Sequence, residues 1–234
     1  MRSLRFILAA AVAVIAAPAT ASPNAGAPQA SAPPAVIELY QSQGCSSCPP
    51  ANAVLNSLAD RKDLITLSFA VTYWDYLGWK DSFAQPAFTE RQKDYMTAYK
   101  RANVSTPQMV INGKGFIVGT TAAEVAQGLA AYARSAPEPQ IALVADRLSV
   151  GPGSGAAQVW LVRYDPKSLD IPATAGENTG RTLPHRHIVK SLVKVADWTG
   201  KPVTVDVPAA PTGLATAVLL QAGRGGPIVA AKAF

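Results

Sequence analysis

The only two cysteines of the 234-residue chain, Cys45 and Cys48, are separated by two residues and lie between a strand-like and a helix-like segment. Residues 36–40 form an apolar run typical of a buried strand, and residues 51–58 carry apolar side chains at helical spacing. A disulfide between such close cysteines closes a very small loop and constrains the unfolded chain little. The pair therefore favours chemistry over a structural crosslink, at the carboxyl end of a strand, where open α/β sheets place their sites.

Strands and helices continue to alternate after the cysteines. Four further units are expected: a strand over 64–71, a helix over 83–101, a hairpin over 108–118 with its turn at Asn112-Gly113, and a helix capped by Thr120 or Thr121 that runs to residue 132. A parallel pair crossed by a helix and followed by an antiparallel hairpin is the thioredoxin layout. The sequence thus predicts a thioredoxin-like α/β domain over residues 35–136.

The second half of the chain has a different texture. Gly/Pro-rich turns separate most of its short apolar or alternating segments, which are 141–150, 157–164, 187–195, 203–207, 215–221 and 228–231. This pattern predicts a small antiparallel, β-rich and sandwich-like domain over residues 137–234 that packs on the first domain.

The N-terminus has the pattern of a secretory signal peptide. Arg2 and Arg5 precede a short apolar stretch, and small residues at 19–21 fit a cleavage site, which predicts a signal peptide over 1–21 and a mature N-terminus at Ser22. Residues 22–34 are rich in Pro, Ala, Ser and Gly and are expected to be a flexible linker. We expect a periplasmic or secreted protein with no integral membrane segment in the mature chain.

Charge excludes one class of partner. The formal net charge is +6, but the basic residues are scattered and no basic run interleaves with aromatic side chains. The sequence therefore indicates no nucleic-acid partner.

The two cysteines are expected to have different roles. A helix N-terminus favours thiolate over thiol, so Cys45 is predicted to be the attacking group, partly exposed beside Gly44. Cys48, which leads into the helix, is predicted to be more buried and to resolve the mixed disulfide. Because Pro49 and Pro50 follow directly, the regular helix is expected to start near Pro50.

Pro107 is the second predicted element of the site. Thioredoxin-like folds carry a cis-proline opposite the dithiol, where neighbouring backbone groups dock an extended substrate, so a cis Thr106–Pro107 bond is expected by analogy of fold. The aromatic side chains Tyr73, Trp74 and Trp79 follow the second strand. They are candidates, with Thr106, for substrate binding, or else they pack the loop onto the sheet.

These residues support a thiol–disulfide exchange protein acting on a protein or small thiol/disulfide substrate, with no cofactor. Two alternatives stay open. The pair is an inert structural disulfide in a non-catalytic binding module, or it holds Cu(I) in a copper carrier with Met109 as a further ligand. Two cysteines supply only half of a structural zinc set.

A second polar group of residues has competing interpretations. His185 and His187 would face the same side of one strand, with Glu177 as a third metal ligand, or else they belong to a solvated strand. Alternatively Glu177, Asn178 and Arg181 form a polar lock between the two halves of the chain.

Four separated motifs resemble one family of secreted bacterial proteins, labelled domain of unknown function 1223. They lie at residues 38–51, 73–81, 106–110 and 176–183 and cover nearly all of the expected mature chain. The resemblance implies a thioredoxin-like domain with a β-rich tail and no established reaction. The family usually carries histidine and aspartate where this chain has Ala70 and Thr72, and an acidic residue in place of Asn52.

Overall fold

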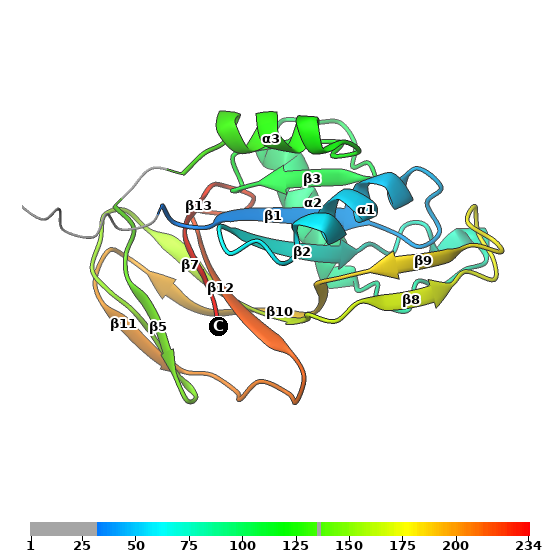
Figure 1. Ribbon diagram of the computed structural model, residues 1–234. Helices are drawn as coiled ribbons and strands as arrows, with labels where there is room; N and C mark the ends of the chain where they lie inside the picture. The colour runs from blue at the N-terminus through cyan, green and yellow to red at the C-terminus, as the bar shows by residue number, and fades with distance from the viewer. Residues whose placement is uncertain (1–31, 135–136) are drawn as a thin grey trace, which may run out of the picture. The chain divides into compact units, whose positions relative to one another are not determined.

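An eight-stranded mixed sheet runs through the computed structural model, which describes residues 32–134 and 137–234 (Figure 1). The strand order is β13-β12-β7-β10-β2-β1-β3-β4. The strands of the sheet are β1 (Ala35–Gln41), β2 (Leu64–Ala70), β3 (Gln108–Ile111), β4 (Gly115–Ile117), β7 (Ala157–Asp165), β10 (Ile188–Trp198), β12 (Ala215–Gln221) and β13 (Ile228–Ala233). The expected signal peptide, the Ser22 terminus and most of the expected linker lie outside the described residues.

The predicted order of elements in the first half is confirmed. Strand β1 pairs in parallel with β2 and antiparallel with β3, and β3 forms a hairpin with β4. The helices are α1 (Cys48–Leu58), α2 (Pro86–Ala98) and α3 (Ala122–Ala131), with a 3-10 turn over Asp75–Leu77. The hydroxyl of Thr121 accepts the backbone N–H of Glu124 at 3.2 Å and so caps α3.

Helix α1 begins earlier than expected, at Cys48 rather than near Pro50. Pro49 and Pro50 fall within its first turn, where a backbone N–H has no intrahelical partner and its absence costs nothing. Cys48 is therefore part of the helix, while Cys45 lies in the turn before it.

Helices cover both faces of the β1–β4 part of the sheet. On one face, side chains of α1 and α3 pack with Ile37, Leu39 and Met109. On the other face, Phe88 and Tyr95 of α2 pack with side chains of alternate strand residues. Because both faces are covered, every residue of β2 is buried.

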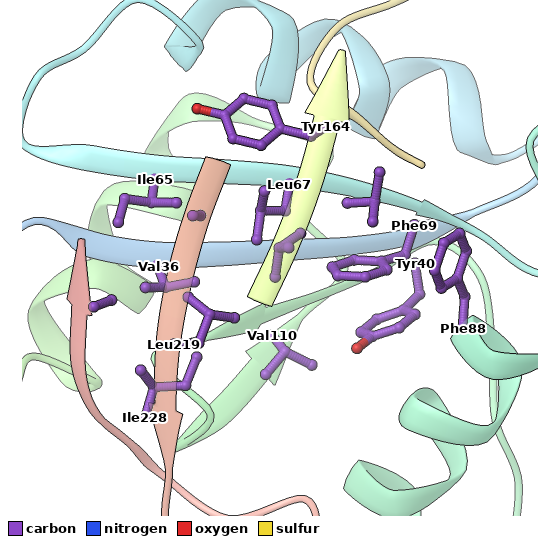
Figure 2. Packing of buried hydrophobic residues seen from close by; sticks show 14 of the residues in the cluster. Val36, Tyr40, Ile65, Leu67, Phe69, Phe88, Val110, Tyr164, Leu219 and Ile228 are labelled. Carbon is purple, nitrogen blue, oxygen red and sulfur yellow. The ribbon is translucent and has the colours of Figure 1, made fainter. Parts of the chain in front are cut away.

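The second half of the chain folds back over the first. Figure 2 shows β7 and β12 crossing β1 and β2, with Val36, Leu67 and Leu219 between them. The two halves also meet at the hairpin turn between β3 and β4, where the backbone N–H of Ile228 donates to the carbonyl of Asn112 at 2.8 Å. Strands from both halves thus share one sheet and one hydrophobic cluster. The division of the chain near residue 136 stays a prediction.

Two smaller antiparallel sheets complete the β-rich half. The three-stranded sheet contains β5 (Ile141–Val144), β6 (Arg147–Val150) and β11 (Val203–Asp206), and the two-stranded one contains β8 (Leu169–Pro172) and β9 (Thr182–His185). The three-stranded sheet shares a second cluster with β7, β12 and β13. The sequence pattern missed β8 and β9, and it merged β5 with β6 because only Ala145 and Asp146 separate the two strands.

Within the described parts of the chain, no helix has both the length and the apolar character needed to cross a membrane.

Candidate functional site

The two cysteines lie at the junction of β1 and α1 and are free thiols. The backbone N–H of Cys48 donates to the carbonyl of Cys45 at 3.2 Å, and the N–H of Cys45 donates to the carbonyl of Ser42 at 3.1 Å. Both cysteines have 0% exposure, so the expectation of a partly exposed Cys45 is wrong. Gly44 does not open an approach to the thiol, because its Cα faces Trp74 on one side and Gly176 on the other.

Hydrogen-bond donors surround the sulfur of Cys45. The Cys48 thiol forms a hydrogen bond with this sulfur, the hydroxyl of Ser47 lies 3.2 Å from it, and the hydroxyl of Thr106 donates to it at 3.3 Å. These hydrogen bonds, with the Cys48 thiol as the largest contributor, lower the pKa of Cys45 to about 6 although burial opposes the shift. Cys45 is therefore largely a thiolate at neutral pH.

Cys48 has the opposite environment. Burial raises the pKa of its thiol far above the usual range, and the hydrogen bond to Cys45 raises it further. The two cysteines are therefore unequal, with the deprotonated sulfur in the turn before the helix and the protonated one inside the first turn of the helix.

The segment before β3 faces the dithiol. The Thr106–Pro107 peptide bond is cis, as expected. The hydroxyl of Thr106 also accepts the indole N–H of Trp74 at 2.7 Å. Since that hydroxyl has one proton, the Trp74 bond leaves the proton free to point at the sulfur of Cys45.

The predicted aromatic residues lie in different surroundings. Tyr73 and Trp74 are half-buried and pack against the main cluster, and the Tyr73 hydroxyl donates to Oε1 of Gln92 at 3.1 Å. Burial raises the pKa of Tyr73 well above its usual value. The indole N–H of Trp79 donates to Oε1 of Gln43 at 2.8 Å. Tyr76 is 78% exposed beside Trp74.

The loop between β8 and β9, residues 173–181, lies against the cysteine turn. Nδ2 of Asn178 donates to the carbonyls of Gln43 and Cys45, both at 2.8 Å. The carboxylate of Glu177 accepts the backbone N–H of Ser46 at 2.9 Å and its hydroxyl at 2.8 Å. Nη1 of Arg181 donates to Oδ1 of Asn178 at 2.8 Å. The predicted polar lock is therefore present, and it closes on the cysteine turn.

The two histidines do not form a pair. His185 ends β9, and His187 lies before β10 with a positive φ of 52°, so the chain turns between them. His185 is fully buried, packs edge-on against Phe83, and burial lowers its pKa to about 4. Nδ1 of His187 bonds to Thr66. The two residues therefore form neither a metal site on one strand face nor a solvated strand, and both predictions are wrong.

Cys45 and Cys48 are the potential metal ligands that the described structure brings together at the site. Among the described residues, no group of three or more His, Cys, Asp or Glu side chains has suitable geometry. Met109, the further copper ligand considered above, is fully buried in the cluster under α1 and α3, with its side chain against Gly119.

A buried ionic network between β1, α2 and β12 escaped the sequence analysis. Arg91 of α2 forms a two-point ion pair with Glu38 of β1, at 2.7 and 2.8 Å, and donates to Gln221 of β12 at 2.9 Å. The hydroxyls of Tyr40 and Tyr95 also donate to Glu38. The only signal in the sequence was a charged residue, Glu38, within an otherwise apolar strand.

Comparisons with known proteins agree with this architecture. The chain is similar to a structural-genomics target protein from Agrobacterium tumefaciens, AtR35, whose crystal structure shares 32% sequence identity. That match covers 87% of this chain and 94% of the other, with a TM-score of 0.74. HBP35 of Porphyromonas gingivalis has a similar fold, with a TM-score of 0.62 at 9% identity over 87% of this chain and 75% of that one.

No curated protein matches the chain. The family model described as protein of unknown function (DUF1223) matches residues 36–221 and so spans the dithiol, the cis-proline and the loop that holds the cysteine turn. The chain is a member of the DUF1223 family.

Proposed function

We propose that this protein is a thiol–disulfide exchange protein of the cell envelope, built on a thioredoxin-like unit. The observation that carries the proposal is the inequality of the two thiols. Hydrogen bonds lower the pKa of Cys45 to about 6, while burial raises that of Cys48. An attacking thiolate next to a protonated resolving thiol is the arrangement that exchange requires.

The exchange proceeds in two steps. The Cys45 thiolate attacks one sulfur of a partner disulfide, forms a mixed disulfide, and releases the other partner sulfur as a thiolate. Cys48 then loses its proton and attacks the sulfur of Cys45, so that the second partner sulfur leaves as a thiolate. The partner disulfide is reduced and the Cys45–Cys48 dithiol is oxidised; the reverse sequence oxidises a partner dithiol.

The neighbouring residues have supporting roles in this proposal. The hydroxyls of Thr106 and Ser47 stabilise the Cys45 thiolate, and Trp74 orients Thr106. The carbonyl of Thr106 lies 3.9 Å from the sulfur of Cys45, so the backbone at Thr106 and Pro107 is where an extended substrate segment would dock. The substrate is a protein or a small thiol or disulfide compound.

The proposed location follows from the N-terminal pattern. Cleavage after residue 21 places the mature protein in the periplasm or outside the cell, where disulfide chemistry operates. Intact-mass measurement of exported protein tests this, and retention of Met1 would contradict it.

A redox titration against glutathione tests the exchange. An exchanger reaches a measurable equilibrium between dithiol and disulfide, whereas a structural disulfide stays oxidised to below about −300 mV. The Cys48→Ser variant is expected to trap mixed disulfides and the Cys45→Ser variant few. Two variants that trap nothing, with Cys-dependent Cu(I) loading of the native protein, would identify a copper carrier instead.

A further inference from the structure

The loop between β8 and β9 touches the cysteine turn over four consecutive residues, 43–46. Asn178 bonds to the carbonyls on both sides of Gly44, and Glu177 bonds to Ser46. The backbone N–H of Glu177 donates to the carbonyl of Gly44 at 3.3 Å. This contact joins segments more than 130 residues apart, because the Asn178–Cys45 bond spans 133 positions.

Asn178 is held so that both of its amide hydrogens are used. Its side chain is 1% exposed, and Arg181 fixes the orientation of the amide by donating to Oδ1. Each Nδ2 hydrogen then points at one carbonyl of the turn. One of these, the carbonyl of Cys45, also accepts the backbone N–H of Cys48, so Asn178 acts on the group that links the two cysteines.

The loop backbone fits closely against the turn. Gly176 has a positive φ of 76°, and a Cβ placed on it would lie 3.3 Å from the Cα of Gly44. Only a residue without a side chain fits this approach comfortably. The carboxylate of Glu177 is exposed, and the two hydrogen bonds from Ser46 lower its pKa, so it stays ionised while it holds Ser46.

We propose that Asn178 and Glu177 are positioning residues for the dithiol, which hold the cysteine turn from outside and control access to Cys45. This proposal rests on the exchange function, and neither residue touches the reacting sulfurs. The covering of Cys45 follows from the same geometry, since the turn is held against the hydroxyl of Thr106, and Gly44 lies close to Trp74.

The positioning role predicts two coupled effects. The donors that stabilise the Cys45 thiolate are set by the shape of the turn, so a loosened turn should raise the pKa of Cys45. A loosened turn should also uncover the sulfur and raise its rate of reaction once it is fully deprotonated. Three titratable side chains lie around Cys45: Cys48, Tyr73 and, through its bond to Ser46, Glu177. The variants below leave Cys48 and Tyr73 unchanged.

The experiment measures alkylation of Cys45 in the reduced full chain as a function of pH. For Asn178→Ala and Glu177→Ala, we expect a midpoint about one pH unit higher, hence about tenfold less thiolate below the midpoint, and a faster plateau rate. Glu177→Gln keeps an acceptor oxygen for Ser46 and should resemble the native protein. Thr174→Ala, which shortens an exposed side chain of the same loop, is the matched control.

The outcomes separate this inference from the exchange function. Native midpoints and plateau rates in both alanine variants would overturn the positioning role, and Glu177→Ala decides the question if Asn178→Ala fails to fold. Native protein without a measurable glutathione equilibrium would overturn the exchange function, whereas a shifted midpoint in the variants would still support the positioning role.

Discussion

A short chain of donors ends on the sulfur of Cys45. The indole of Trp74 donates to the hydroxyl of Thr106, which donates to Cys45. A hydrogen bond to a charged acceptor is stronger than one between neutral groups, so the thiolate gains more from this chain than the thiol does. At the scale of single residues, the identity of residue 106 thus bears directly on the reactivity of the dithiol.

Thr106→Val is expected to raise the pKa of Cys45 by about one unit, because it removes a hydroxyl donor that stabilises the thiolate. Thr106→Ser keeps the hydroxyl and should leave the pKa nearly native. The absorbance of the thiolate, followed from pH 4 to 10, measures both. An unchanged pKa in Thr106→Val would show that the hydroxyl does not stabilise the charged sulfur.

His185 is a buried base without a hydrogen-bond partner for either ring nitrogen among the described residues. Burial lowers its pKa to about 4, from the usual 6.5. Between these values the unfolded chain binds a proton that the folded chain does not. Stability from this residue is therefore complete above pH 6.5 and is lost as the pH falls toward 4, by roughly 3 kcal/mol in all.

His185→Phe should remove this part of the pH dependence, since the new ring keeps the contact with Phe83 and binds no proton. Urea unfolding at several values between pH 4 and 7 gives the free energy of unfolding for each protein. The native protein is expected to lose stability more steeply than the variant as the pH falls. Parallel profiles would mean that His185 is protonated in the folded state.

At the scale of elements, one buried ion pair connects three of them. Arg91 of α2 reaches Glu38 of β1 and Gln221 of β12, and the two charged side chains are 5% and 0% exposed. A buried charge that loses its partner is costly, although a buried pair is not itself a large source of stability. The pair therefore fixes how α2, β1 and β12 dock more than it adds to stability.

Glu38→Gln and Arg91→Met should each destabilise the protein by about 3–5 kcal/mol, because each leaves the other group unpaired in the interior. The double variant should cost less than the sum of the two. Chemical denaturation measures all three. Lys93→Ala on the same helix breaks an exposed pair with Glu90 and should cost less than about 0.5 kcal/mol. Additive effects of the two buried substitutions would contradict the coupling.

At the scale of the whole molecule, the two halves share the core drawn in Figure 2. Of the sixteen buried residues in this cluster, seven come from β7, β10, β12 and β13. These seven residues pack in the same cluster as Val36, Leu67 and Val110 and help to bury them. The second half is therefore part of the support for the dithiol, through the core as well as through the 173–181 loop.

A fragment ending at residue 134 is expected not to unfold cooperatively, because it exposes the apolar face that β7 and β12 cover. The fragment, residues 32–134, is compared with a longer protein that spans residues 32–234. Urea titration followed by circular dichroism distinguishes them. A cooperative transition in the fragment would show that the first half folds independently, as the predicted division into domains implies.

The sequence alone determined the local features of this protein. Period-two and helical spacing located most strands and the helices, Asn112-Gly113 marked a hairpin, and Thr121 marked a helix start. The Cys-x-x-Cys pair identified the candidate site, since strand, turn and helix are all contiguous there. These features depend on neighbours within a few residues, which is the range that a sequence pattern reports.

The tertiary structure decided what each buried face packs against. The sequence pattern shows that Glu38 lies on a strand and that Cys45 follows that strand, but not which distant group meets either residue. The partners of Cys45 are Thr106, 61 positions away, and Asn178, 133 positions away. The burial of the dithiol and the shared core arise from contacts between such distant segments, and so does the share of the Cys45 pKa shift that Thr106 contributes, whereas the larger share comes from Cys48 in the same turn.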